Sequence, residues 1–428
     1  MDAQFSDLDS FDAETRRTAL LSLWRRSDNK EIRAIGVGVN LHAHTFFSYN
    51  AYGYSPSRYA LLAREAGLTM AGIVDLDVLD GLSEFLEAGR LLGLRTCVSI
   101  ESRVYVPEFA TRVINSPGEP GIAYHMGVGF TKPIDHPFLA KTVYIAQQRI
   151  RDMIGRVNGY LSPATLIFED DVLPLTPNGN ATERHLCEAY ERKAVALFPR
   201  AAERASFWKA KLGDAPAEGA PLQGLIRSKT MKKGGPGYVQ PDSGSFPKLC
   251  DMNRFVLHAG AIPTFAWLDG MSEGEQAIEE FFEVGIASGA AALNIIPDRN
   301  FTPGVKDQKL RNLYNVVALA EERGFPIVVG TEMNAPGSKF AVSFETEELK
   351  PLMPAFLKGA HVVYGHTVLQ GRAGMGYLSA WAKDTFRTVT EKNVFYERVG
   401  RELQPAAETR LDFLNDAATP HQILAMIG

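Results

Sequence analysis

Apolar residues recur along the chain in two alternating patterns, one typical of strands and one of helices. Short runs rich in β-branched and apolar residues cover 35–44, 70–77 and 95–106. Between them, residues 55–67 and 82–93 carry apolar side chains three or four positions apart, the spacing of an amphipathic helix. Strands that alternate with helices predict a parallel sheet covered by helices, either as a barrel or as a doubly wound fold.

This alternation is interrupted once and then resumes. From about residue 132 to 250 the pattern is mostly helical, and it ends in the basic, glycine-rich stretch 226–244. Further strands are then predicted at 260–268, 291–297, 325–334 and 361–366. The predicted parts are therefore a helical extension over 1–35, a barrel over 36–131 and 251–428, and a mostly helical insertion over 132–250.

The overall composition is that of an ordinary globular protein. Hydrophobic residues make up 45% and charged residues 22%, and the formal net charge is −5. This balance favours neither nucleic acid nor a membrane surface as the main partner. Three widely spaced cysteines do not form a disulfide framework, and no apolar run approaches the ~20 residues of a membrane helix. We expect a cytoplasmic protein, and its oligomeric state stays open.

Two histidines at the end of the first predicted strand are the first sign of chemistry. His42 and His44 are separated by one residue, and side chains two positions apart on a strand point to the same face. Two imidazoles on one face can begin a metal site. Two polar residues at a strand exit would look the same, so this pair alone leaves both interpretations open.

Further potential ligands lie on the strands that follow. Asp75 and Asp77 close the second strand, Glu101 lies near the end of the third, His125 lies in the fourth, and Glu332 closes a late strand. Each one alone could be a polar strand end. Together they predict a cluster at the carboxyl end of the barrel strands, where barrel enzymes place their active sites. The first strand is followed by no glycine-rich phosphate loop, which disfavours a dinucleotide-binding fold.

These residues and several segments resemble the polymerase and histidinol phosphatase (PHP) superfamily. The similar segments are NLHAHTFFS (40–48), VDLD (74–77), SIE (99–101), Tyr124-His125, ATERHL (181–186), KKGGPGYVQP (232–241), HAGAIPTFAWL (258–268) and GTEMN (330–334). The resemblance covers about residues 36 to 340. It implies a distorted, TIM-like (βα)7 barrel that binds up to three divalent metal ions and hydrolyses phosphate esters.

The departures from the family pattern reduce the expected number of ions. Leu76 and Trp267 replace family histidines, Glu332 replaces an aspartate, and Asn334 replaces another histidine. The resemblance then implies one or two ions of Zn, Mn or Fe per chain. The implied ligands are His42, His44, Glu101, His125 and Glu332.

The resemblance and the local patterns also suggest roles for other residues. Asp75 and Asp77 are expected to orient ligand imidazoles or to take part in catalysis, and His125 to act as a ligand or a general acid. A substrate phosphate needs cationic and polar partners. The residues expected to contact the substrate are Arg184, His185, Arg227, Lys229, Trp267, Asp269, Asn334, His366 and Arg372.

Three functions fit these residues. The first is hydrolysis of a small phosphorylated molecule by a metal-activated water. The second is a catalytically altered barrel that binds a metal or a ligand as a sensor or a partner module. The third is metal-assisted hydrolysis of an amide or a lactone, because one fold supports several chemistries.

Overall fold

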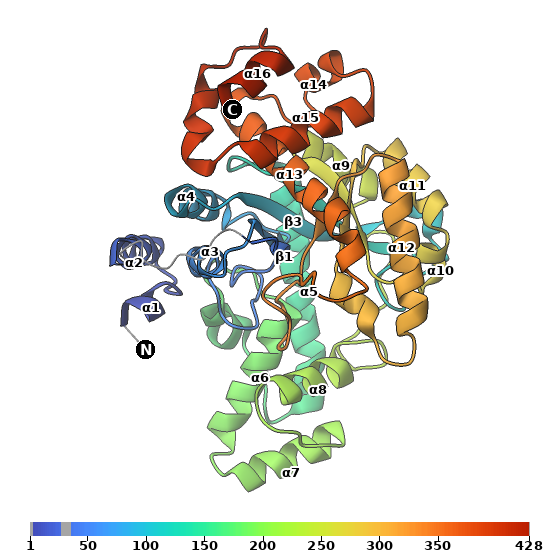
Figure 1. Ribbon diagram of the computed structural model, residues 1–428. Helices are drawn as coiled ribbons and strands as arrows, with labels where there is room; N and C mark the ends of the chain where they lie inside the picture. Colours follow the sequence, from blue (N-terminus) through green and yellow to red (C-terminus); the bar gives the residue numbers. More distant parts are fainter. Residues whose placement is uncertain (1–2, 27–35, 428) are drawn as a thin grey trace.

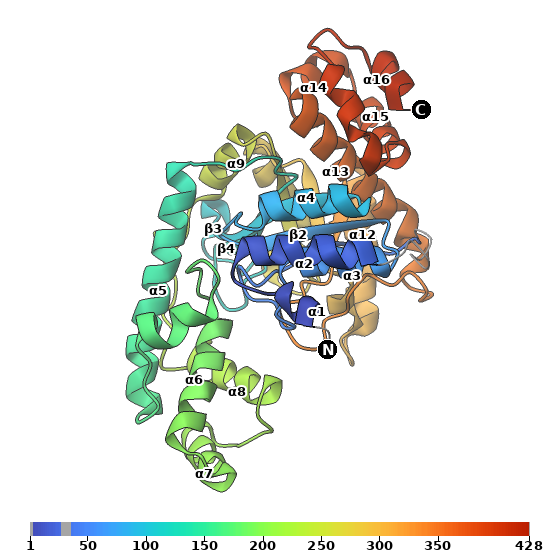
Figure 2. The same ribbon diagram turned by 90° about the vertical axis from the view of Figure 1, so that its left-hand side faces the viewer.

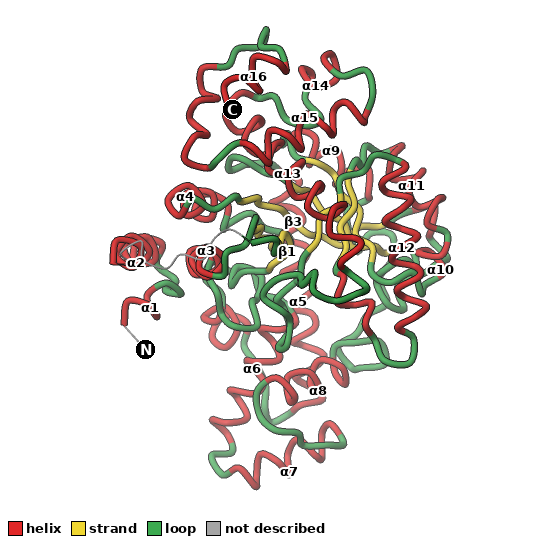
Figure 3. The backbone as a smooth tube through the Cα atoms, viewed as in Figure 1, coloured by secondary structure: helices red, strands yellow, loops and turns green. Residues whose placement is uncertain are grey.

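A nearly closed sheet of seven strands forms the centre of the molecule, with helices packed around it (Figures 1 and 3). The computed structural model describes residues 3–26 and 36–427. The strands are β1 (Val39–Ala43), β2 (Met70–Leu76), β3 (Thr96–Tyr105), β4 (Ile122–Val128), β5 (Ile262–Trp267), β6 (Ala292–Ile295) and β7 (Ile327–Val329). They lie in sequence order around the sheet. A parallel bridge between Ala43 and Glu332 links its two edges, so the fold is a distorted TIM-like barrel.

One strand breaks the parallel arrangement that the sequence predicted. β1–β3 and β5–β7 pair in parallel, but β4 runs antiparallel to both β3 and β5. The loop between β3 and β4 contains only the short helix η1 (Pro107–Phe109). Without a longer helix in this loop, β3 and β4 do not form a βαβ unit, the connection that usually makes neighbouring strands parallel. The strand direction at β4 therefore differs from the prediction.

Helices lie before and between the strands. They are α1 (Ala3–Asp7), α2 (Ala13–Arg26), α3 (Pro56–Glu65), α4 (Leu82–Leu92), α9 (Leu249–His258), α10 (Glu273–Gln276), α11 (Ile278–Ala287), η4 (Pro297–Phe301) and α12 (Lys306–Glu322). Of these, α3 and α4 match the two predicted at 55–67 and 82–93. The Ser55 side chain caps α3 by accepting a hydrogen bond from the Arg58 amide, and Gly93 ends α4 in the left-handed conformation. Residues 27–35 of the predicted extension lie outside the described part of the chain.

The segment between β4 and β5 is helical and carries a hydrophobic cluster of its own. Its helices are α5 (Pro137–Leu161), η2 (Phe168–Val172), η3 (Leu173–Leu175), α6 (Glu183–Leu197), α7 (Ala201–Leu212) and α8 (Ala220–Thr230). Val157, Leu186, Tyr190 and Ile226 are buried in this cluster, which is separate from the barrel core. Figure 2 shows α5 running along one side of the barrel, with α6, α7 and α8 extending beyond it.

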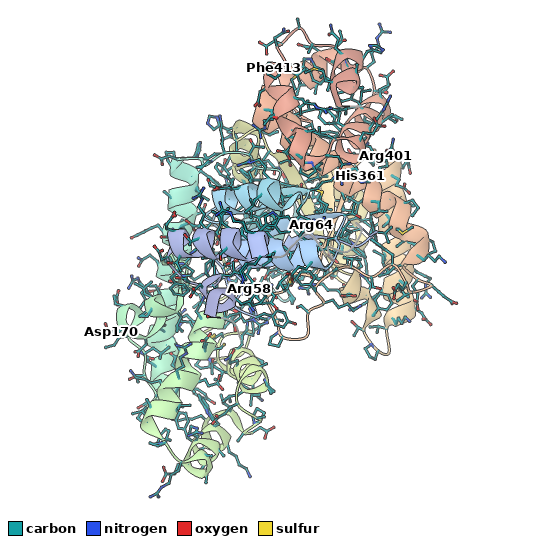
Figure 4. The ribbon with its side chains drawn as sticks, turned by 60° about the vertical axis from the view of Figure 1, so that its left-hand side comes forward. Arg58, Arg64, Asp170, His361, Arg401 and Phe413 are labelled. Carbon is teal, nitrogen blue, oxygen red and sulfur yellow. The ribbon has the colours of Figure 1, made fainter. Side chains whose placement is uncertain are left out.

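The last part of the chain is also helical, which corrects the strand predicted at 361–366. It contains η5 (Lys350–Leu352), α13 (Met353–Ala373), α14 (Ala380–Thr385), α15 (Val389–Glu402), η6 (Pro405–Phe413) and α16 (Pro420–Ile427). The run HVVYGH lies inside α13, and Figure 4 shows its first residue, His361, close to Arg401 where this group of helices meets the barrel. A short apolar run does not distinguish a strand from a buried helix.

Two glycines explain why this run can be a buried helix. A side chain at Gly359 would meet the Ile327 carbonyl oxygen at 2.0 Å, and one at Gly365 would meet the Tyr396 carbonyl oxygen at 2.2 Å. α13 therefore packs directly against the backbone of β7 and of α15. In the described part of the chain no helix has the length and apolar character needed to cross a membrane.

Candidate metal and anion site

Two imidazoles and one carboxylate meet at the carboxyl end of β1 and β3. His42 lies on β1 and His44 directly follows the strand, and the two are 1% and 4% exposed. Their Nε2 atoms lie 3.9 Å and 3.5 Å from the two carboxylate oxygens of Glu101 on β3. One ligand atom from each residue lies within 4.8 Å of the others. The structure thus brings together three of the five ligands expected from the sequence.

The hydrogen bonds behind the two histidines fix which ring nitrogen is free. Nδ1 of His42 lies 3.1 Å from the Asn294 Oδ1 atom, which can only accept, so this Nδ1 carries the proton. The Ser48 hydroxyl donates to Asp75 at 2.6 Å and therefore accepts from Nδ1 of His44 at 2.9 Å. Nε2 is thus the ring nitrogen of each histidine that lies toward Glu101.

The two free Nε2 atoms are the observation that fits a metal ion. Both are buried and have no hydrogen-bond partner among the described residues. Burying a polar atom without a partner costs free energy of about 1–3 kcal/mol. Imidazole nitrogens backed by hydrogen bonds on Nδ1, together with a carboxylate, form a typical donor set for a divalent ion. The residues present therefore fit the group that the sequence implied.

Asp75 and Asp77, the two expected catalytic aspartates, occupy different places. Asp75 lies behind His44 and accepts hydrogen bonds from the Thr45 amide, the Thr45 hydroxyl and the Ser48 hydroxyl. Asp77 lines a cavity that His44 and Glu101 also line, and it accepts a hydrogen bond from Ser102. Burial raises the pKa of both carboxyls. Asp75 is thus placed to orient a ligand imidazole, and only Asp77 faces the cavity.

Glu332, which was also expected to be a metal ligand, lies at this end of the barrel, but its carboxylate is paired with Arg299. Its Oε1 atom accepts from Nε and Nη2 of Arg299 at 3.0 Å and 2.6 Å, and Asn334 donates to its Oε2 atom at 3.2 Å. Burial would raise the pKa of Glu332, but Arg299 outweighs this effect and lowers the pKa to about 2. Glu332 is therefore ionised and paired.

The structure does not bring His125 to this cluster. In β4 it lies opposite Ser102 rather than opposite Glu101, so it shares the other face of the sheet. Its Nε2 atom bonds Asn253 of α9, and its ring packs edge-on against Phe265. The expectation that four successive strands deliver their ligands to one site was wrong at β4, because the register of this strand puts His125 opposite Ser102, on the face away from Glu101.

Trp267 also lies away from the cavity, although it was expected to form its wall. It is 2% exposed and shares a face of β5 with Phe265, whose ring packs against Phe281 and Phe282 of α11. Asp269, two residues further on, forms an ion pair with Lys309 at 2.8 Å. Neither residue lines the cavity, because the outward face of β5 is covered by helices.

His366 and Arg372 are likewise remote, because the expected strand exit is the interior of α13. His366 is fully buried, donates through Nε2 to the Gly129 carbonyl at 3.1 Å, and accepts at Nδ1 from the Tyr377 amide at 2.9 Å. Arg372 lies near two carboxylates, Glu408 at 3.6 Å and Asp412 at 3.3 Å. Both residues have structural partners in the C-terminal helices.

A second wall of the same cavity is formed by helices of the insertion. Arg184 and Arg227, both expected from the sequence, line it from α6 and α8. Arg227 and Lys232 share the carboxylate of Glu183 at 2.8 Å and 2.7 Å. Arg184 has no carboxylate within ion-pair distance among the described residues, so its charge is directed into the cavity without compensation.

His185 and Lys229, also expected on this wall, do not line the cavity. His185 accepts a hydrogen bond from the Thr182 amide in a capping box, packs edge-on against Tyr49, and burial lowers its pKa to about 4. Lys229 is exposed. On a helix, neighbouring residues point in different directions, which is why Arg184 faces the cavity and His185 does not.

Several residues of the site were missed by sequence reasoning. Arg103 lies two positions after Glu101 on β3, a spacing that indicated the same face. Asn294 is a polar residue within an apolar strand, which also was a signal. For Arg149 of α5 the sequence contained no such signal, because this residue is one of many charged residues on a long helix. Its guanidinium lies over the Phe246 ring at 4.4 Å, and burial lowers its pKa to about 10.

The cavity between the two walls is large and positively charged. Its volume is about 800 Å³, and its lining includes seven lysines and arginines against five aspartates and glutamates. The whole chain, in contrast, has a net charge of −5. An excess of one charge sign on low-dielectric walls concentrates the field and attracts ligands of the opposite sign. The cavity therefore favours an anion beside the candidate metal ligands.

Comparison with models of known protein families and with curated proteins gives no match. Among solved structures, an amidohydrolase from Chromobacterium violaceum, with bound sulfate and no metal, aligns over 74% of this chain and 96% of its own, with a TM-score of 0.50 and 17% identity. A "putative metal-dependent phosphoesterase" from Bifidobacterium adolescentis aligns over 76% and 98%, with a TM-score of 0.48 and 18% identity. At 17% identity the likeness shows the fold alone: this chain shares a distorted barrel with a solved hydrolase.

Proposed function

We propose that this chain is a metal-dependent hydrolase that cleaves the ester of a small phosphorylated molecule. The observation that carries the proposal is the shared cavity: unsatisfied Nε2 atoms of His42 and His44 lie on one wall, and the unpaired guanidinium of Arg184 lies on the other. The first feature suits a divalent cation and the second suits an anion. A phosphate ester is a substrate that needs both.

Three residues of the barrel, His42, His44 and Glu101, would hold the ion. A divalent ion at such a site lowers the pKa of a water molecule, so that hydroxide is available near neutral pH, and polarises a phosphoryl oxygen. Asn294 and Ser48 keep both imidazoles in the tautomer with a free Nε2 atom. Mixed imidazole and carboxylate donors suit Zn, Mn or Fe(II).

The helical residues would bind and orient the anionic part of the substrate. Arg149 and Arg184 line the cavity and have no carboxylate within ion-pair distance among the residues described. Arginine binds phosphate through paired N–H donors with a fixed direction. Asp77, which lines the cavity and is held by Ser102, is the acidic group placed to exchange a proton with the substrate.

The test is a metal analysis combined with a substrate screen. The chain is purified after growth with Zn, Mn or Fe, its metal content is measured, and phosphomonoesters are offered to the wild type and to His42→Ala. We expect about one bound ion and phosphate release in the wild type, and loss of both in the variant. His125→Asn, which changes a histidine on the outer face of the sheet, should retain the metal.

Two results would contradict the proposal. A wild-type chain that binds no metal under any supplement would exclude a metal-dependent enzyme. A chain that binds metal but releases no phosphate, and instead hydrolyses amides or lactones, would assign a different substrate class to the same site.

A further inference from the structure

The pairing of Glu332 with Arg299 is unusual for a carboxylate so close to potential metal ligands. The backbone of Glu332 contacts both histidines directly: its amide donates to the His42 carbonyl at 2.7 Å, and its carbonyl accepts from the His44 amide at 2.8 Å. Its side chain nevertheless does not belong to the group of ligand atoms formed by His42, His44 and Glu101 in the described chain. The side chain is instead directed to Arg299.

Arg299 uses two of its three nitrogen atoms to hold Glu332. Nε and Nη2 both donate to Oε1, while Oε2 accepts from Asn334. Both carboxylate oxygens thus have donors, and the carboxylate charge is compensated. Releasing Glu332 for another cation would require breaking a charge-assisted pair, which is among the stronger interactions in proteins.

The guanidinium of Arg299 lines the same cavity as Glu332 and Glu101. Besides Glu332, Glu101 and the Tyr124 hydroxyl lie close enough to raise the pKa of Arg299, against the opposing effect of burial. The side chain of Arg299 is 43% exposed, and this exposed part lines the cavity. Its third nitrogen, Nη1, has no hydrogen-bond partner among the described residues. A fixed positive charge with a free donor therefore faces the space beside Glu101.

We propose that Arg299 takes the place of a second metal ion: it holds Glu332 away from His42 and His44, limits the site to one ion, and offers Nη1 to an anionic oxygen of the substrate. In sites with two ions, the second cation neutralises carboxylates and binds a substrate oxygen. The guanidinium supplies both interactions and cannot be removed by a chelator. This inference rests on the proposed metal-dependent function.

The first test measures metal affinity, not activity. Titration against a competing chelator compares the wild type, Glu332→Gln, Arg299→Ala and the double variant. We expect one ion per wild-type chain, an affinity within about twofold of the wild type for Glu332→Gln, and an affinity about tenfold higher for Arg299→Ala, because the freed carboxylate can then join the histidines. The double variant should return to the wild-type affinity.

Several results would overturn this inference. They are two ions per wild-type chain, a loss of about tenfold or more in Glu332→Gln, and an unchanged or weaker affinity in Arg299→Ala. Thermal unfolding checks that each variant is folded. If Arg299→Ala does not fold, Glu332→Gln decides the question alone, because a carboxylate already held by Arg299 should contribute less than about tenfold to the metal affinity.

The second test concerns the free donor. Binding of inorganic phosphate to the metal-loaded chain should weaken by about tenfold in Arg299→Ala and less in Arg299→Lys, which keeps the charge. Lys306→Ala removes a nearby cation that pairs with Glu348 and does not line the cavity, so phosphate binding should be unchanged. Equal phosphate binding in Arg299→Ala and wild type would overturn the assignment of Nη1.

These measurements separate the two proposals. If the wild type binds no metal, the proposed function fails. If it binds one ion that is lost in His42→Ala, but Glu332→Gln also loses affinity, then the proposed function stands and the role of Arg299 fails.

Discussion

The two walls of the cavity differ in how their functional groups are held. On the barrel wall, His42, His44 and Glu101 project from strands, are at least nine-tenths buried, and are positioned by the parallel ladder from β1 to β3. On the helical wall, Arg149 and Arg184 project from two helices of a segment with its own hydrophobic cluster. The barrel wall offers lone pairs in a fixed arrangement, and the helical wall offers N–H donors on long side chains.

This difference indicates a division of roles. A metal ion requires donor atoms within a few tenths of an ångström, which neighbouring strands with buried side chains can provide. An anion is attracted over a longer range and tolerates more flexible partners. The two walls can therefore be tested independently: changes on the barrel wall should affect metal binding, and changes on the helical wall should affect anion binding.

The largest effect is expected for Glu101→Gln. Glu101 is the carboxylate that lies between both Nε2 atoms, and its loss removes the negative charge from the donor set. Metal affinity should fall by more than about 100-fold, beyond the range usual for residues that only support ligands, as measured by competition with a chelator. Glu84→Gln, on a carboxylate that pairs with Arg16, is the control. Unchanged metal content in Glu101→Gln would contradict the barrel-wall role.

A smaller loss is expected for Asp75→Ala. Without an acceptor at this position, the Ser48 hydroxyl is free to donate to Nδ1 of His44 rather than accept from it, which moves the imidazole proton to Nε2 and blocks the lone pair. Metal affinity should fall by about 10–100-fold, and ¹⁵N shifts of the His44 ring should report the changed tautomer. Asp80→Ala, whose partner is Asn178, should change neither. An unaltered tautomer of His44 would show that Asp75 stabilises the fold but does not set the position of the imidazole proton.

On the helical wall, Arg184→Ala and Arg149→Ala should each weaken binding of the phosphorylated substrate. A charged hydrogen bond contributes about 1.5–3 kcal/mol, so we expect KM to rise about tenfold or more, with metal content unchanged. Lys229→Ala changes an exposed residue outside the cavity and should leave KM as it is. Loss of metal in either arginine variant would mean that the two walls do not act independently.

The smallest expected effect is the contribution of Glu183 to the free energy of unfolding, which should depend on pH. Burial would raise the pKa of Glu183, but Lys232 and Arg227 outweigh it and lower the pKa from 4.5 to about 2. A lowered folded-state pKa stabilises the protein above the unfolded value, so this contribution is complete above about pH 4.5 and is lost as the pH falls toward 2. It should be on the order of 1–3 kcal/mol.

Urea unfolding of wild type and Glu183→Gln at pH 7, 4 and 3 measures this contribution. The variant should be less stable at pH 7, and the difference should shrink as the pH falls. A difference independent of pH would exclude the ion pairs with Lys232 and Arg227 as its source.

Sequence patterns predicted much of the barrel and part of its site. The period of two on a strand placed His42 and His44 on one face, and the neighbouring parallel strands brought Glu101 to them. Helix ends at Ser55 and Gly93 were readable because capping depends on local residues. These features involve residues close in sequence or strands that follow one another, so local physics was sufficient.

Tertiary structure decided the rest. The register of β4 turned His125 to the outer face, and the close packing of Gly359 and Gly365 against β7 and α15 accommodates the segment around His366 as a buried helix. The pairing of Arg299 with Glu332, and the arrival of Arg149 from α5, join residues far apart in the chain. No local pattern encodes such contacts, because they depend on how strand direction and helix packing bring distant side chains together.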